Sequence, residues 1–278
     1  LFYDLQRELV IVKYWHINSQ NFLLLSSLTV GDAISWAAHF SKLEPSSTIE
    51  PSITGFFPLF EEKSASFSML NHALKVITTA VKHLNNDQIP VVGADQPLFA
   101  LLKQLQWHHD MYNEKKLVVI MGSLHIELHA LSLVGKVLEG SGWEDVLVEA
   151  GVTTSGRVKA ILHASHLKRC RLTHEISIVV FTQLKKLAYI QAGPDLSFEE
   201  WNVKRCTESP TFFFWDLILR LQILVLMFVR SIRQRNFQLY RATLEKIAPL
   251  SFSLDCTHYS RWLPVNIRDL KCLPPSIL

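Results

Sequence analysis

Acidic and imidazole side chains follow two apolar runs of the chain. Asp95 directly follows the run 89–94, and His125 and Glu127 come shortly after the run 117–121. Magnesium takes oxygen ligands, and a metal held by two or three acids can activate water and stabilise a leaving oxygen in phosphoryl transfer. Asp95 is therefore a candidate catalytic and metal-binding residue that would need partners. Equally open is a structural role, in which its carboxylate caps the following helix.

The pattern H-x-E-x-H is formed by His125, Glu127 and His129. It differs from the zinc-protease pattern H-E-x-x-H, in which the glutamate directly follows the first histidine. On a helix, His125 and His129 would share one face and could hold a metal together. An apolar stripe beside them favours packing and hydrogen bonding instead, and Glu127 could simply complement the helix dipole. The stripe consists of Leu124, Leu128 and Leu131.

Positive charge gathers between positions 163 and 174, in a stretch that is sparing of acids. Such a patch could bind the phosphates of DNA. The alternative is a solvated helix face without a ligand. The candidate contacts with nucleic acid are Lys168, Arg169, Arg171 and His174, with His163 and His166 beside them.

A mixed cluster stands near the end of the chain, where Asp255 is followed by His258, Tyr259 and Trp262. These side chains could close over a site that is formed elsewhere. They could also form a packed corner, and their spacing fits both interpretations.

Two strand–helix units in succession would position these residues. We predict a strand over 89–94, a helix to about Trp107, a polar loop over 108–116, a second strand over 117–121 and a second helix to Glu139. A strand, a helix and a parallel strand form the common right-handed crossover. Ligands of such sheets bind at the carboxyl ends of the strands. Asp95, His125 and Glu127 are therefore expected at one rim of the sheet.

Helical spacing and capping residues predict further helices. Apolar residues predict a helix over 68–84, capped by Ser66 or Ser68. The residues 153–155 offer caps for a helix through His163 and His166, whereas 176–188 fits a helix or a strand. The apolar run 56–60 is expected to pack against the core. The fold class is a mixed, helix-rich α/β domain.

The most apolar stretch, 212–229, requires a choice between a membrane span and a core helix. Asp216, Arg220 and Gln222 interrupt it, and a central Asp or Arg costs about 2.5–3.5 kcal/mol on insertion scales. Asp216 and Arg220 have the i,i+4 spacing of a helical ion pair. Ser209 and Pro210 provide a helix start. These features favour a buried core helix, and no membrane partner is expected.

The composition is that of a folded domain with a sizeable core: 278 residues, 49% hydrophobic, 19% charged and a net charge of +3. This charge carries no global signature of nucleic-acid binding. Four widely spaced cysteines fit reduced, intracellular thiols. Glycine-rich phosphate loops, nucleophile elbows and kinase signatures are absent from the sequence, which argues against those enzyme classes. The chain opens in mid-pattern, so we expect a truncated N-terminal segment over 1–52 and a main α/β domain over 53–278.

From about Ile53 to its end the chain resembles uncharacterised, transposon-derived animal proteins that recur in many near-copies. The motifs that carry the resemblance are Asp95-Gln96-Pro97-Leu98, Leu105-Gln106-Trp107, Gly122-Ser123-Leu124-His125-Ile126-Glu127, Gly140-Ser141-Gly142-Trp143 and His258-Tyr259-x-Arg261-Trp262-x-Pro264. The segment 169–174 departs from the pattern, which is richer in histidine there.

A more distant similarity is to transposases with a ribonuclease-H-like core, in which an Asp ends the fourth strand and a histidine follows the fifth. Asp95 and His125 match these positions. The similarity implies that Asp95 is the second metal-binding acid and that the third comes from the region of Asp255. The first acid belongs on an earlier strand, where Asp4 and Asp32 are the candidates.

The resemblance thus implies a ribonuclease-H-like sheet with flanking helices. The expected function is that of a transposase-derived, nuclease-like DNA-binding domain, which would use Mg²⁺ for phosphoryl transfer if active, with Asp95, Glu127 and Asp255 as catalytic residues and Asp95, His125 and Asp255 as metal ligands. The expected location is intracellular and, for a DNA-binding role, nuclear. The alternative is a non-enzymatic scaffold that binds DNA or protein and retains the fold.

Overall fold

The structure is a computed structural model, and it describes residues 66–193 and 195–274 together with 55–57, 59, 61 and 277. The chain divides into two compact units, Leu1–Thr54 and Gly55–Leu278. Asp4, Asp32 and the expected boundary between 52 and 53 lie outside the described residues, so they stay predictions. All that follows concerns the second unit.

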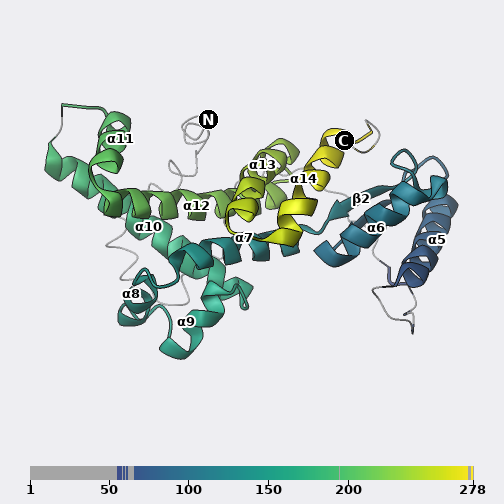
Figure 1. Cartoon of the computed structure of the whole chain (residues 1–278), viewed down its shortest axis with the longest axis horizontal. Helices are drawn as coiled ribbons and strands as arrows, with labels where there is room; N and C mark the ends of the chain where they lie inside the picture. Colours follow the sequence, from purple (N-terminus) through teal and green to yellow (C-terminus); the bar gives the residue numbers. More distant parts are fainter. Residues whose placement is uncertain are drawn as a thin grey trace, which may run out of the picture. The chain divides into compact units, whose positions relative to one another are not determined.

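Two parallel strands and the helices that follow them confirm the expected crossover unit (Figure 1). Strand β1 (Val91–Ala94) leads into α6 (Gln96–His108), and β2 (Val118–Met121) leads into α7 (Ser123–Leu138). The strands pair in parallel, from Val91 opposite Val118 to Ala94 opposite Met121. Because the second strand carries Val118, Val119 and Met121 as buried side chains, it forms the apolar centre of this unit.

Helices make up most of the remaining described chain. A short 3₁₀ turn, Asp110–Tyr112, lies between α6 and β2. The other helices are α5 (Phe67–Leu84), α8 (Trp143–Glu149), α9 (Ser155–Leu162), α10 (Leu167–Ala192), α11 (Phe198–Glu208), α12 (Pro210–Arg233), α13 (Phe237–Ser253) and α14 (Thr257–Lys271). The expected mixed, helix-rich α/β class is therefore confirmed.

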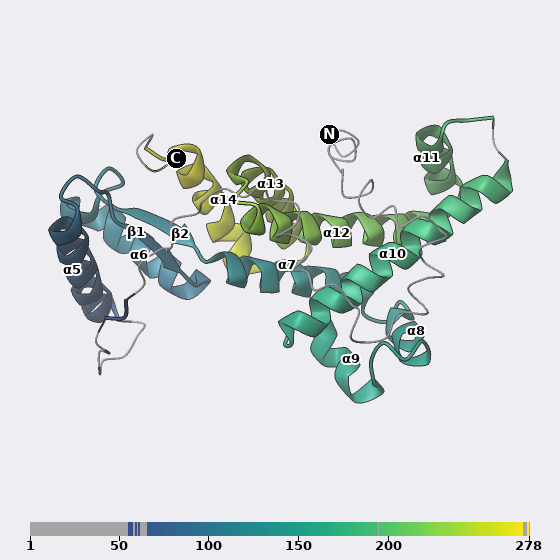
Figure 2. The ribbon, with the colours of Figure 1, turned by 180° about the vertical axis from the view of Figure 1, so that it is seen from behind.

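Helix α12 lies alongside α7 and also packs against α10, α11 and α13 (Figure 2). Its start is the predicted one, because the Ser209 hydroxyl accepts a hydrogen bond from the Phe212 N–H and Pro210 occupies the first turn. The predicted ion pair between Asp216 and Arg220 is present.

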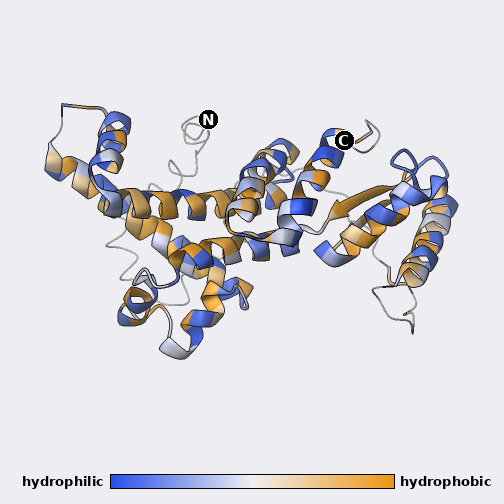
Figure 3. Cartoon of the chain, in the orientation of Figure 1, coloured by the Kyte–Doolittle hydropathy of each residue, from blue (hydrophilic) through white to orange (hydrophobic). Residues whose placement is uncertain are grey.

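Among the described helices, α12 alone is long and apolar enough to cross a membrane, and 61% of its most apolar window is buried inside the protein. Figure 3 shows that hydrophobic residues make up much of α12, and α7, α10, α11 and α13 pack against this helix. Gln222 and Asp216 are 1% and 4% exposed, respectively, so these two polar side chains of the helix face the protein. This packing favours the interpretation as a core helix.

Three local expectations have a different outcome. The apolar run at 56–60 does not pack against the core where it is described, since Phe56 and Leu59 are almost fully exposed. The helix expected through His163 and His166 is two helices, because Ala164 between them has a φ of 53°. The segment 176–188, open between helix and strand, lies within α10, which packs against α12.

Candidate functional site

The carboxyl ends of β1 and β2 meet at one rim, as the crossover predicts. The Gly122 N–H donates to the Ala94 carbonyl across 2.6 Å, which places the residues that follow the two strands side by side. A Cβ at Gly122 would lie 3.3 Å from that carbonyl oxygen and 3.6 Å from the His125 ring. The structure therefore brings Asp95 and the histidine-bearing start of α7 together at this rim.

Asp95 caps α6, which was one of the two roles predicted for it. Its Oδ1 accepts a hydrogen bond from the Leu98 N–H at 3.0 Å. Burial and, secondarily, the nearby charge of Asp95 raise the pKa of Tyr259 to about 12. The carboxylate of Asp95 thus faces the rim while it holds the first turn of its own helix.

Tyr259 and His129 stack at the rim, with ring centroids 3.7 Å apart. The Tyr259 hydroxyl donates to the His125 carbonyl at 3.1 Å, and the His129 Nε2 is 2.8 Å from the Ser251 hydroxyl. Burial and the charge of Lys136 lower the pKa of His129 to about 4, so the ring is neutral at pH 7. His129 therefore packs and hydrogen-bonds, whereas the ring of His125 is exposed.

Glu127 points away from the rim and pairs with a residue that sequence reasoning had assigned to DNA. Its two carboxylate oxygens accept hydrogen bonds from the Nε and Nη2 atoms of Arg171 on α10. The Glu127 side chain is 3% exposed, and its hydrogen bond is the main cause of the raised pKa of Arg171. The structure therefore assigns this pair to the contact between α7 and α10, which corrects the catalytic role expected for Glu127.

Asp255 lies in the turn between α13 and α14, with an exposed side chain and a φ of 53°. Its neighbours Leu254 and Cys256 contact the Lys136 ammonium near the end of α7. Lys136 lies eleven residues beyond His125 on that helix, or about 16 Å along its axis. Asp255 is thus placed toward the far end of α7 and does not join Asp95 at the rim.

No group of three or more His, Cys, Asp and Glu side chains could hold a metal within the described part of the chain. Of the three expected catalytic residues, Asp95 is the one that lies at the rim. The magnesium site that the similarity implied therefore stays a prediction.

The predicted basic surface is present only in part. Lys168 and Arg169 are exposed at the start of α10. His174 is 2% exposed, stacks on Trp143 and has its Nδ1 3.0 Å from the Gln222 Nε2. The assignment of His174 to DNA is therefore corrected, because its apolar surroundings bury the ring. The assignment of Arg171 to DNA is also corrected, because its guanidinium group donates hydrogen bonds to Glu127.

Two further cations, Arg157 and Lys159 on α9, are exposed close in sequence to Lys168 and Arg169. Helix α9 packs against α10, and the sequence holds no acid from 150 to 174. Sequence reasoning missed Arg157 and Lys159 because they lie outside the histidine-rich stretch; the run without acids was the signal that could have found them.

Side chains of the resemblance motifs join elements of the fold to one another. Trp107 of α6 stacks on Trp262 of α14 with centroids 5.9 Å apart, and the Gln106 side chain donates to the Leu117 carbonyl. The Trp143 indole N–H donates to the Ser177 hydroxyl. These side chains join segments that are far apart in the sequence.

Two buried polar residues outside the motifs complete the surroundings of the rim. Lys103, 1% exposed, pairs with Glu114 and Asp269, and the Asn266 Oδ1 accepts a hydrogen bond from the Met121 N–H. Neither residue has a sequence signal, because a lysine or an asparagine on a helix is ordinarily exposed.

A family model described as a domain of unknown function (DUF8702) matches residues 35–192 of the 278, which is more than half of the chain. No curated protein and no solved structure matches the chain.

Proposed function

The chain belongs to this family of domains of unknown function, and from its own residues we propose that it is a transposase-derived DNA-binding domain with a ribonuclease-H-like sheet. The strand–helix–strand unit with Asp95 at its rim supports the proposed fold. The DNA-binding role rests on one observation, the exposed cations of α9 and α10 in a segment without acids: Arg157, Lys159, Lys168 and Arg169. Such a role implies a nuclear location.

Binding without cleavage is the function that we favour. Of the acids expected at a metal site, Asp95 lies at the rim and Glu127 pairs with Arg171, and the described part of the chain contains no group of three or more His, Cys, Asp and Glu side chains that could hold a metal. The basic surface, in contrast, needs no further residue to attract phosphates, because contacts between cations and the DNA backbone do not depend on sequence.

Salt-dependent binding to a 20-base-pair duplex, followed by fluorescence anisotropy, tests this proposal. Alanine at Arg157, Lys159, Lys168 and Arg169 is expected to weaken binding and to lower the slope of log affinity against log salt by up to about four, roughly one for each lost phosphate contact. The matched control replaces four exposed lysines elsewhere: Lys75, Lys82, Lys115 and Lys116. Equal losses in both variants, or no salt dependence in the parent chain, would refute a specific basic surface.

A metal-dependent nuclease is the second candidate, and the position of Asp95 at the carboxyl rim favours it. Asn caps helices about as well as Asp, whereas Ala costs about 1 kcal/mol. Asp95→Asn therefore removes the charged metal ligand while it keeps the cap, and Asp95→Ala removes both. Loss of Mg²⁺-dependent strand cleavage in Asp95→Asn at unchanged stability would favour this candidate. A parent chain that does not cleave leaves binding as the function.

A further inference from the structure

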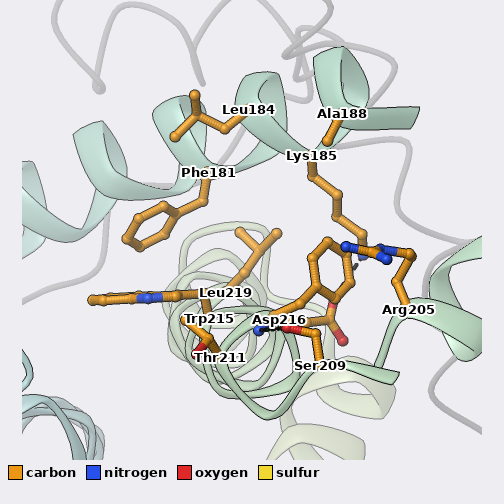
Figure 4. Close-up of a pocket in the computed structure, with 11 residues that line it drawn as sticks. Phe181, Leu184, Lys185, Ala188, Arg205, Ser209, Thr211, Trp215, Asp216 and Leu219 are labelled. Atoms are coloured by element: carbon orange, nitrogen blue, oxygen red, sulfur yellow. Dashed lines mark hydrogen bonds and ion pairs between the residues drawn. The ribbon is translucent and has the colours of Figure 1, made fainter. Parts of the chain in front are cut away.

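A pocket of about 460 Å³ lies between α10, α11 and α12 (Figure 4). This volume is in the range of sites for small organic molecules, whose linings are mostly apolar with a few polar groups. The pocket lies on the second half of α10, whereas Lys168 and Arg169 of the basic surface lie at the start of that helix. Its ligand is therefore independent of the proposed binding of DNA.

Aromatic and aliphatic side chains form most of the lining. Phe181 of α10 and Trp215 of α12 contact each other, with ring centroids 5.2 Å apart, and close one end of the pocket beside Leu184. Phe212 lines the pocket from the first turn of α12 and packs edge-on against Trp201 of α11, which is 4% exposed. Contacts between rings therefore hold the walls of the pocket in place, as in sites that are largely formed before a ligand binds.

The charged residues of the lining are paired within the protein. Asp216, 4% exposed, binds Lys185 at 2.6 Å, and Arg205 pairs with Glu208 at 3.4 Å. The Ser209 hydroxyl caps α12 and accepts a hydrogen bond from a backbone N–H of that helix. A charged ligand would lose its hydration in the pocket and gain no partner from these groups, whereas a neutral apolar ligand carries no such cost. The lining therefore favours a ligand without charge.

We propose that this pocket binds a neutral aromatic molecule, of about two or three rings by the volume of the pocket. Its rings pack against Phe181, Leu184, Phe212 and Trp215. Aromatic rings pair in offset or edge-on arrangements and bury a large apolar area, and a rigid body loses less conformational freedom on binding than a flexible chain does. The ion pairs of the lining stay intact beside the ligand.

Fluorescence titration of the full chain with N-phenyl-1-naphthylamine, a neutral probe of linked aromatic rings, tests the proposal. Emission is expected to rise and to saturate at about one probe per chain. The matched anion, 8-anilinonaphthalene-1-sulfonate, carries its sulfonate in the middle of the same rings, so burial of the rings also buries the charge. It is expected to bind at least about tenfold more weakly, because the sulfonate finds no free partner. Equal or tighter binding of the sulfonate, or no saturable binding of the neutral probe, would overturn the proposal.

Matched variants on α10 locate the ligand. Leu184→Trp fills the apolar end and is expected to weaken binding of the neutral probe about tenfold or more, because the added indole takes the place of buried ligand surface. Its control is Leu187→Trp on the same helix, which is similarly exposed, 52% against 56%, and does not line the pocket. Equal effects of the two changes would refute this pocket as the site.

Arg205→Gln separates a neutral from a charged ligand. Because Arg205 pairs with Glu208 and the proposed ligand needs no charge, the affinity for the neutral probe is expected to change less than about twofold, as for the loss of an exposed ion pair. A larger loss would mean that the ligand depends on this cation, which would overturn the proposal.

A second copy of the chain is the other occupant to test, since Leu184 and Leu187 are both exposed on α10. Sedimentation of the parent chain as a monomer that binds the probe would support the small ligand. A dimer that Leu184→Glu converts into a monomer would place a second copy over the pocket and overturn the proposal.

Discussion

Several polar side chains that the sequence indicates as candidate site residues form hydrogen bonds or ion pairs within the protein. Glu127 is the plainest case, because both of its oxygens bind Arg171 while its side chain is 3% exposed. A buried charge that loses its partner costs about 3–5 kcal/mol, whereas removal of both charges can be nearly neutral. The structural role therefore makes a prediction that differs from a catalytic one.

Arg171→Ala, which leaves the buried Glu127 carboxylate without its partner, is expected to lower the free energy of unfolding by about 3–5 kcal/mol, and Glu127→Ala with Arg171→Ala by clearly less than the sum of the two single changes. Urea unfolding of the four chains measures the coupling. Additive single effects would mean that the two side chains do not stabilise each other.

His174 makes stability depend on pH. Burial lowers its pKa from 6.5 to about 4, so the unfolded chain binds a proton more readily than the folded one. Its contribution is therefore fully present above about pH 6.5 and is lost as the pH falls towards 4, by about 3 kcal/mol in total.

The comparison that isolates this effect is His174→Phe, which keeps a ring against Trp143. Urea unfolding between pH 7 and 4.5 should show a shallower pH dependence for this variant than for the parent chain. Burial also lowers the pKa of His129 to about 4, so His129 contributes to the pH dependence of stability in the parent chain and in the variant alike. An unchanged pH dependence would contradict a neutral, buried His174.

At the scale of elements, the close approach of α7 and α9 depends on a single glycine. A Cβ at Gly135 would lie 1.9 Å from the Leu162 carbonyl oxygen, which ends α9. Backbone cannot move aside as a flexible side chain can, so the two helices would have to separate. The basic surface on α9 is positioned by this contact.

Gly135→Ala is expected to destabilise the chain by about 1–3 kcal/mol or more through overpacking. Gly156→Ala is the control, since nothing lies within 4 Å of a Cβ at that position of α9, and it should stabilise by about 0.5–1 kcal/mol. Thermal or urea unfolding distinguishes the two. Stabilisation in both variants would mean that α7 and α9 do not approach so closely.

At the scale of the whole described unit, the late helix α14 packs against β2. The Asn266 side chain, 0% exposed, accepts the Met121 N–H at 2.9 Å, so the helix partly satisfies the edge of β2 in place of a further strand. Lys103 links α6 to Asp269 of the same helix, and Trp262 stacks on Trp107. The carboxyl-terminal helix thus holds the rim formed some 150 residues earlier.

Asn266→Ala leaves the Met121 N–H buried without its acceptor and is expected to cost about 1–3 kcal/mol. Hydrogen exchange of the Met121 amide should accelerate accordingly. Lys271→Ala on the same helix removes only an exposed pair with Glu245 and should change stability by at most about 1 kcal/mol. Equal protection of Met121 in both variants would rule out the role of Asn266.

The sequence by itself determined the elements whose signals are local. The strand–helix–strand order, the caps at Ser66 and Asp95 and the Asp216–Arg220 pair depend on residues within a few positions of one another, and apolar periodicity sets which face each helix buries. Only the tertiary structure decided which buried faces meet. The position of α10 makes Arg171 the partner of Glu127 and places His174 in the core. Periodicity predicts that a helix face is covered, but which helix covers it depends on contacts between segments far apart in the chain.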